Sequence, residues 1–353
     1  MAEGLVDVTS PPDESPCGLH HPRAAARLLS LQREAGDWEG EVVWCPVITA
    51  QVVIAHRIMG QASDAQRRRL ILRHFASTQH PDGGWGLHPA SAPYRFVTTL
   101  VYVAARLLDE SPDSPMLASA GAWLQAAPGD VFALPSWGKF WLSLLGLYSR
   151  DGLHPCPPEL FLLPDWVSFA PNRLYCHTRY IYPGMATLGA GPQLDLGAFG
   201  VSLRAELGIA GQDSVRRRHA LADTDAYVRP GPLLRIAYDA MRAAGPVWRR
   251  LPGTAALRRH ALTRCLERIE AGQRATNHHG LSPVSSVLNA VALWRAGSPA
   301  ARSVTGLEAW AWEDEAHGLR RAGARSTTWD TAFSVQALLA AGRMPDSVAA
   351  SPS

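Results

Sequence analysis

The sequence contains few cysteines, and none of them stands at a short paired spacing. There are five, an odd number, with no Cys-x-x-Cys pair. They are Cys17, Cys45, Cys156, Cys176 and Cys265. This usage argues against the disulfide framework of a small secreted domain. We expect reduced thiols in a cytoplasmic protein.

A secretory signal, a long apolar run and a basic stripe are also missing. The first sixteen residues are acidic and rich in Pro and Ser, whereas a signal needs a basic start and an apolar run. No stretch reaches the roughly 20 apolar residues that span a bilayer. The net charge of +3 comes from scattered Arg, and the runs Arg67–Arg69 and Arg216–Arg218 are typical of solvated helix faces. We expect no export, no nucleic-acid partner, and at most peripheral membrane contact.

Metal and phosphate motifs are absent from the sequence as well. The pairs His20-His21 and His278-His279 are adjacent, so their side chains diverge rather than converge on one ion. There is no glycine-rich phosphate loop and no recognisable Ser, His and Asp arrangement. We expect no metal and no cofactor.

The composition is that of a globular protein with unusually many tryptophans. The chain has 353 residues, of which 47% are hydrophobic and 18% charged, so it can form two domains with a sizeable core. Twelve Trp stand among 27 Pro and 30 Gly. Aromatic faces held by loops between packed elements suit apolar or cationic ligands.

The periodicity of the apolar residues predicts an all-α fold. Apolar stretches of helical length alternate with Gly, Pro and Asp clusters, and runs of alternating β-branched residues are nearly absent. Short loops between the stretches predict antiparallel helical hairpins. The predicted helices are Val47–Met59, Ala65–Ser77, Arg95–Leu108, Phe140–Tyr148, Leu233–Ala243, Ala255–Ile269, Val284–Ala296 and Asp330–Ala341.

One short pattern, Q-x-x-x-G-x-W, occurs twice, forty-seven residues apart. Its members are Gln32, Gly36 and Trp38, and then Gln79, Gly83 and Trp85. The Gly permits a tight turn, and the Gln and Trp side chains can clamp successive helix ends. The period suits one helical hairpin per repeat, and such hairpins commonly close into an α/α barrel, or toroid. We interpret these residues as structural rather than catalytic.

Longer stretches resemble the oxidosqualene cyclase and squalene-hopene cyclase family, in that family's order. They are Gly83–His88, Leu134–Leu142, Pro164–Trp166, Cys176-His177, Trp329–Phe333 and Gln336–Leu339. The resemblance extends from about Leu28 to Gly342. The stretch Glu39–Pro46 departs from animal and plant members and is typical of bacterial ones.

The resemblance implies two α/α barrels, the first inserted in the chain of the second, with the active-site cavity between them. Residues 25–280 would form the inserted barrel and residues 281–345 the start of the second, catalytic barrel. Residues 1–24 and 346–353 would be flexible. The family's chains run to about twice this length, so this chain resembles their N-terminal half.

The family's catalytic acid has no counterpart in the sequence. It lies in an Asp-Cys-Thr-Ala-Glu motif that does not occur here. Protonation of an epoxide or alkene needs a carboxylic acid held in its protonated form. Asp223-Thr-Asp225-Ala226 is only faintly similar to the Asp-x-Asp-Asp acid of squalene-hopene cyclases, and Asp330 is expected to cap a helix or fix a loop. We assign no catalytic residue.

The resemblance does assign residues to a cavity wall. Polyene cyclisation passes through carbocations, which aromatic faces stabilise by about 0.5–2 kcal/mol each. By its motif, Trp141 would line the cavity, Trp329 would face the ring cations and His177 the late side-chain cation. Tyr175 and Thr178 replace the Trp and Cys of animal members, Tyr182 would lie near the entrance, and Val284 would be a small lining residue. For Val284, an ordinary core position is the favoured alternative.

The membrane-facing stretch of the family corresponds to residues 204–228. Here it includes Gln212–His219 and lacks the Trp expected at a membrane interface. Attachment through this stretch is therefore not supported by the sequence.

Three functions remain open at this point. The first is half of a triterpene cyclase, an isomerase of triterpenoid and sterol biosynthesis, which acts on squalene or oxidosqualene together with a second polypeptide carrying the C-terminal half. The second is a non-catalytic isoprenoid-binding or degenerate cyclase-like protein. The third is another α/α toroid, such as a prenyltransferase β-subunit or a toroid glycosidase, although the zinc set and paired carboxylates of those enzymes do not appear.

Overall fold

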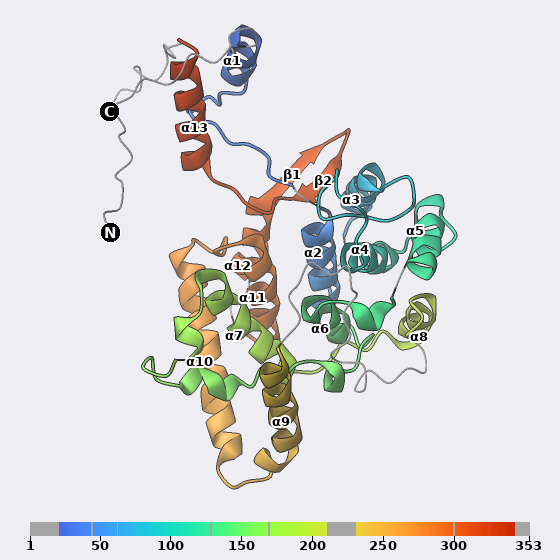
Figure 1. Ribbon diagram of the computed structural model, residues 1–353, viewed down its shortest axis with the longest axis vertical. Helices are drawn as coiled ribbons and strands as arrows, with labels where there is room; N and C mark the ends of the chain where they lie inside the picture. Colours follow the sequence, from blue (N-terminus) through green and yellow to red (C-terminus); the bar gives the residue numbers. More distant parts are fainter. Residues whose placement is uncertain are drawn as a thin grey trace, which may run out of the picture. The chain divides into compact units, whose positions relative to one another are not determined.

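The computed structural model describes residues 21–43, 45–61, 63–127, 129–168, 170–209, 231–298 and 301–342 (Figure 1). These residues are predominantly helical, which confirms the predicted all-α class. The contacts divide the chain into two compact units. The first unit combines residues 1–41 with residues 325–353, and the second comprises residues 42–324. The predicted barrel boundaries at residues 280 and 281 stay a prediction.

The helices of the second unit account for most of the described chain. They are α2 (Val47–Ile58), α3 (Ala65–Thr78), α4 (Arg95–Leu107), α5 (Pro115–Ala126), α6 (Ser136–Leu144), α7 (Cys176–Ala190), α8 (Gly197–Glu206), α9 (Pro232–Trp248), α10 (Thr254–Ala275), α11 (Pro283–Arg295) and α12 (Ala301–Gly306). Short 3-10 turns lie at Val131–Ala133, Arg150–Gly152, Pro158–Leu162, Pro171–Arg173 and Leu307–Trp310.

Local start signals explain several of these helices. Asp64 accepts a hydrogen bond from the N–H of Arg67 and so caps α3. Ser114 caps α5, whose first residue is Pro115. The predicted helix Phe140–Tyr148 instead runs from Ser136 to Leu144, because it starts directly after Pro135 and ends before Gly146, which takes a left-handed conformation.

Close helix contacts form the core of the second unit. Helix α2 packs on α4, and α7 packs on both α10 and α11. A Cβ atom at Gly184 of α7 would lie 2.8 Å from Leu288 Cδ2 and 2.9 Å from Asn289 Oδ1 of α11. Both distances are too short for a real Cβ atom, so the absence of a side chain at Gly184 permits the close approach of α7 and α11.

A short hairpin is the exception to the helical class among the described residues. Strand β1 (Ala311–Asp314) pairs antiparallel with β2 (Gly318–Arg321), with Ala311 opposite Arg321. Strand β2 packs on α3 and is entirely buried. Arg321 reaches Glu308 through two hydrogen bonds of 3.0 and 3.1 Å, which compensates the buried guanidinium.

The first unit joins the two ends of the described chain. Its helices are α1 (His21–Ser30) and α13 (Thr327–Ala340). Trp38 packs with Ala25 of α1 and Leu338 of α13 in one buried cluster. Arg325 and Glu39 form an ion pair across the same unit. Residues 300 or more positions apart therefore share one small core.

Candidate functional site

Trp141 lies in α6 and is fully buried in the core of the second unit. Its ring meets that of Trp137 edge to face, with centroids 5.9 Å apart and an interplanar angle of 89°. The indole Nε1 is buried, and no hydrogen-bond partner for it occurs in the described part of the chain. The structure thus places Trp141 among core side chains, and its predicted contact with a substrate stays a prediction.

The predicted residues of the Cys176-His177 motif lie at the start of α7. Tyr175 directly precedes the helix and has 70% of its surface exposed. His177 and Thr178 form part of the first turn, but their side chains lie outside what the structure describes. The predicted roles of these three residues therefore rest on their position in the chain.

Tyr182 and Val284 lie on α7 and α11, two helices that pack on each other. Tyr182 is half-buried beside Cys156, Phe161 and Cys265. Burial raises the pKa of its phenol, and the neighbouring Cys156 thiol raises it further. Val284 is half-buried against the main core. The packing brings the elements of these two predicted residues together.

Trp329 belongs to the first unit, in the first turn of α13. Its side chain is 66% exposed and contacts the ring of Phe333 one turn later, with centroids 5.7 Å apart. Ser326 caps the helix by accepting from the Trp329 N–H, so Asp330 is not the cap. The Asp330 carboxylate instead accepts a hydrogen bond of 2.8 Å from the N–H of Gly40, and it fixes the loop after Trp38.

Side-chain hydrogen bonds to neighbouring helices hold the segment Gln79–Trp85, which we call the second Gln-Trp segment. The Gln79 amide donates to the carbonyl of Gly83 at 2.8 Å and to that of Met116 at 2.9 Å. The Trp85 indole donates to the Phe75 carbonyl at 2.8 Å, and the Trp85 N–H donates to Thr98 Oγ1 at 2.9 Å. These bonds fasten the end of α3 to α4 and α5.

The segment Gln32–Trp38, the first Gln-Trp segment, repeats three of these bonds. The Gln32 amide donates to Gly36 O at 2.8 Å, and the Trp38 indole donates to Leu28 O at 2.7 Å. The Trp38 N–H donates to Thr331 Oγ1 at 3.0 Å. Thr331 lies 293 residues further along the chain, so this partner could not be found from local sequence.

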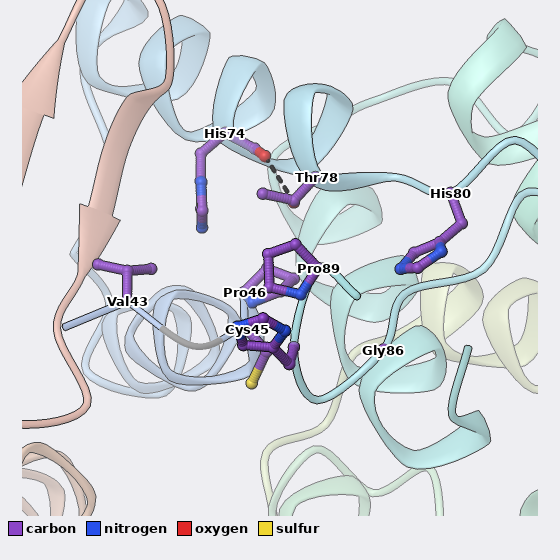
Figure 2. A pocket seen from close by; sticks show the side chains of 9 residues that line it. Val43, Cys45, Pro46, His74, Thr78, His80, Gly86 and Pro89 are labelled. Carbon is purple, nitrogen blue, oxygen red and sulfur yellow. Dashed lines mark hydrogen bonds between the residues drawn. The ribbon is translucent and has the colours of Figure 1, made fainter. Parts of the chain in front are cut away.

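A small cavity lies beside α3 in the second unit. Figure 2 shows that the His74 ring points away from α3 and into this cavity. Its volume of about 30 Å³ corresponds to about one water molecule. Its lining residues are Val43, Cys45, Pro46, His74, Thr78, His80, Gly86, His88 and Pro89. Burial lowers the pKa of His74 to about 4 and raises that of Cys45 to about 11, so both are uncharged at neutral pH. The cavity is too small for an isoprenoid.

A larger cavity of about 380 Å³ lies between α2, α3 and α12 and is mainly polar. Its lining residues are His56, Gln61, Ser63, Asp64, Arg67, Val304, Thr305 and Glu308. Despite burial, the neighbouring Arg321 and Arg67 lower the pKa of Glu308, which keeps its carboxyl ionised. The two cavities contain none of the predicted lining residues.

Five carboxyl groups of the described residues have pKa values below their ordinary range, because hydrogen-bond or charge partners stabilise the ionised form of each. The groups are Asp37, Glu39, Glu206, Glu308 and Asp314. Asp223 and Asp225 lie outside the described residues. Among the described residues, no group of three His, Cys, Asp or Glu could hold a metal ion.

Helix α9 carries an apolar face that the sequence analysis missed. None of its residues is buried, and Leu233 and Ile236 are 83% and 64% exposed. The Tyr238 ring stacks on that of His154 with centroids 4.4 Å apart, and Arg242 donates to the Asp151 carbonyl. With 3.6 residues per turn, Tyr238 and Arg242 fall opposite Leu233 and Ile236. The helix is therefore attached by its polar side and turns its apolar side outward.

Comparison with known proteins identifies the family of this chain. A sequence model of the squalene-hopene cyclase N-terminal domain matches residues 22–316. The chain belongs to the squalene-hopene and oxidosqualene cyclase family. Human lanosterol synthase is 34% identical to this chain over 326 residues. The cycloartenol synthase of Dictyostelium discoideum is 32% identical over 332 residues, and the lanosterol synthase of Aspergillus fumigatus is 31% identical over 325.

The matches cover most of this chain but less than half of each relative. The human match includes 89% of this chain and 43% of the relative, the Dictyostelium match 91% and 46%, and the Aspergillus match 90% and 43%. This chain therefore corresponds to the N-terminal half of its curated relatives. In the part of it that the structure describes, every helix is too short or too polar to cross a membrane.

Proposed function

We propose that this chain forms part of the wall of a cavity in which squalene or 2,3-oxidosqualene cyclises through carbocations, and that it does not turn over substrate alone. The observation that carries the proposal is its membership of a family whose relatives are named lanosterol synthase and cycloartenol synthase. The chain covers about 43% of the human relative. A second polypeptide with the C-terminal half would supply the rest.

Exposed aromatic rings support a role in binding a cationic polyene. Trp329 and Phe333 form an aromatic pair on α13, and both are more than half exposed. Tyr175 presents a further exposed ring before α7. A desolvated aromatic face stabilises a cation by about 0.5–2 kcal/mol, and an apolar wall also excludes the water that would quench it. These rings can serve the reaction without performing acid–base chemistry.

The proton donor would have to come from outside the described residues. Protonation of an epoxide needs a neutral carboxylic acid, whereas Glu308 and Glu206 are paired with Arg and keep lowered pKa values. The sequence has no Asp-Cys-Thr-Ala-Glu motif. We infer that the Gln-Trp segments contribute stability, since their Gln and Trp side chains hydrogen-bond to backbone carbonyl groups of α1, α3 and α5.

Reconstitution with a C-terminal cyclase half carrying the acid motif tests the proposal. We expect the chain alone to bind squalene or 2,3-oxidosqualene without product, and the pair to release a cyclised product. Trp329→Ala and His177→Ala should reduce binding or turnover at unchanged helical content, and Trp294→Ala, an exposed Trp of α11, is the matched control. Binding without turnover in the pair would favour the non-catalytic isoprenoid-binding alternative. Failure to bind either lipid would contradict both.

We further propose peripheral membrane contact through α9 rather than through residues 204–228, of which 210–228 lie outside the described residues. Leu233, Ile236 and Val247 are each more than 60% exposed, and Trp248 follows at the helix end beside Arg249 and Arg250. An outward apolar face with Trp and Arg at its border is typical of interfacial helices.

Flotation with vesicles of phosphatidylcholine and phosphatidylserine tests this contact. We expect Ile236→Glu to reduce the bound fraction strongly, because it places a charge in the apolar face. Leu31→Glu, an exposed Leu of the first unit, is the control and should float like the unmodified protein. Equal flotation of both variants and the unmodified protein would show that α9 is not the contact.

A further inference from the structure

The turn that joins α9 and α10 presents arginines that the protein itself does not use. Residues 240–266 include six Arg and no Asp or Glu. Three of these Arg are engaged with carbonyl or carboxylate oxygens of the protein, namely Arg242, Arg258 and Arg264. The other three are exposed, and their side chains have no hydrogen-bond or ion-pair partner in the described part of the chain; they are Arg249, Arg250 and Arg259.

Hydrogen bonds fix this turn, residues 249–253, which connects α9 and α10 at the bottom of the view in Figure 1. The Leu251 N–H donates to the Trp248 carbonyl at 3.1 Å, and the Thr254 hydroxyl donates to the Leu251 carbonyl at 2.7 Å. Gly253 precedes α10 at φ +81°, a left-handed conformation that glycine adopts without strain. The turn is thus short and closed, and it holds the two arginines that follow α9 at the end of the helical hairpin.

Apolar side chains stand among these arginines. They lie at the end of α9, in the turn and near the start of α10, and each is at least 39% exposed. The side chains are Val247, Trp248, Leu251 and Leu257. Because the turn is short, these apolar groups and the three free guanidinium groups lie at the same end of the hairpin. We call this surface, residues 247–259, the arginine tip.

We propose that the arginine tip binds the acidic headgroups of phospholipids, so that the chain selects anionic membrane surfaces. This inference rests on the proposed membrane contact of α9 and names the lipid chemistry that the contact recognises. Guanidinium groups form paired, charge-assisted hydrogen bonds with phosphate and carboxylate oxygens, and Arg clusters beside an apolar surface are attracted to acidic lipids. The exposed Leu and Trp side chains would enter the acyl boundary, while the Arg side chains extend to the headgroups.

The charges around the arginine tip favour an acidic bilayer over a neutral one. The nearest carboxyl groups along the chain, Asp239 and Glu267, lie on either side of residues 240–266, and Glu267 pairs with Arg264. Insertion of apolar side chains contributes to binding on any bilayer, whereas the Arg contribution needs negative headgroups. A nucleic acid also offers phosphates, but it would leave the apolar side chains of the tip in water.

Binding of the full chain to vesicles of two compositions tests the selection. One set contains phosphatidylcholine alone, and the other also contains phosphatidylserine. Arg249→Gln/Arg250→Gln should lower the partition coefficient for the acidic vesicles about 30-fold, which corresponds to about 1 kcal/mol for each charge. Binding to the neutral vesicles should stay nearly unchanged. The matched control, Arg57→Gln/Arg69→Gln, removes two exposed Arg from α2 and α3 and should bind like the unmodified protein.

Two further measurements separate charge from folding. Arg249→Lys/Arg250→Lys should retain most of the preference for acidic vesicles, because it keeps both charges at the tip. A higher ionic strength should release the unmodified protein from acidic vesicles and have little effect on neutral ones, because salt screens the attraction. Circular dichroism of each variant should show the helical content of the unmodified protein.

The outcomes distinguish the selection of lipids from the membrane contact itself. Equal binding of the unmodified protein to both vesicle types, or equal losses in the Gln variant and its control, would overturn the role of the arginine tip and leave the α9 contact standing. If Ile236→Glu binds acidic vesicles normally while the Gln variant does not, the tip acts without the apolar face of α9. Tighter binding to an oligonucleotide than to acidic vesicles would overturn the proposal in favour of a nucleic-acid partner.

Discussion

The carboxylate of Glu206 links α8 to α4 and offers the sharpest test of the structure. Arg106 donates to it from Nε at 2.9 Å and from Nη2 at 3.0 Å. The Tyr102 hydroxyl donates at 3.0 Å and the Ser202 hydroxyl at 2.9 Å. The Arg106 guanidinium also lies over the ring of Phe199. Four donors therefore converge on two oxygens, and Glu206→Gln replaces one of those oxygens with a further donor.

We expect Glu206→Gln to destabilise the second unit by about 2 kcal/mol at pH 7. Removing one partner of a fully buried ion pair costs about 3–5 kcal/mol, and we reduce this because the side chains of Arg106 and Glu206 keep 11% and 17% exposure. Hydrogen bonds from Arg106, Ser202 and Tyr102 lower the pKa of the Glu206 carboxyl below its ordinary 4.5 despite burial. Its contribution is complete above about pH 4.5 and is lost as the pH falls through the lowered pKa.

Urea unfolding of the full chain, followed by circular dichroism, measures this effect. The matched control is Glu267→Gln, which breaks the ion pair of Glu267 with Arg264, where both side chains are 52% exposed. We expect the control to cost about 0.5 kcal/mol or less. The difference between the unmodified protein and Glu206→Gln should shrink below pH 4. Equal losses from the two variants, or a difference that does not change with pH, would refute the reasoning.

Three other predictions address different contacts. Thr98→Val should lower the free energy of unfolding in urea by about 1–3 kcal/mol, because it leaves the buried Trp85 N–H without its acceptor. Thr331→Val should lower it less, because Thr331 is only half-buried. A larger loss from Thr331→Val would contradict this difference in burial. Gly184→Ala should destabilise the folded protein by about 1–3 kcal/mol, because the added methyl group overlaps α11. The control Gly189→Ala, at an exposed position of the same helix, should be neutral or stabilising. Equal effects of the two variants on the melting temperature would disprove the close packing. Burial lowers the pKa of His74 to about 4, so the free energy of unfolding should fall by about 1–3 kcal/mol as the pH drops from 6.5 to 4. His74→Gln should make this decline smaller. The same pH profile in the variant and the unmodified protein would count against a buried, neutral His74.

Helix positions in this protein follow mainly from local sequence. The predicted Val47–Met59 ends one residue later than α2, and the predicted Val284–Ala296 starts and ends one residue later than α11. Their boundaries are set by nearby Pro and Ser residues, which fix the backbone or satisfy free N–H groups of the first turn. The predicted Leu233–Ala243 is shorter than α9, which continues through Pro246 to Trp248.

The placement of individual aromatic residues did not follow from their motifs. Trp141 and Trp329 both lie in stretches that resemble the family, yet Trp141 is fully buried and Trp329 is two-thirds exposed. A Trp at helical spacing fits either environment, and the difference depends on which elements pack on its helix. The outward face of α9 was likewise decided by contacts from His154 and Asp151, far away in the chain.

The sequence by itself determined the family, the helical class and the residues of both Gln-Trp segments, because these depend on local pattern and on ordered motifs. Only the tertiary structure decided that the Trp38 N–H donates to Thr331 and that Glu206 accepts hydrogen bonds from residues of α4. The physical reason is that a hydrogen bond needs a partner within about 3 Å. Distance along the chain does not reveal which residues the packing of helices brings that close.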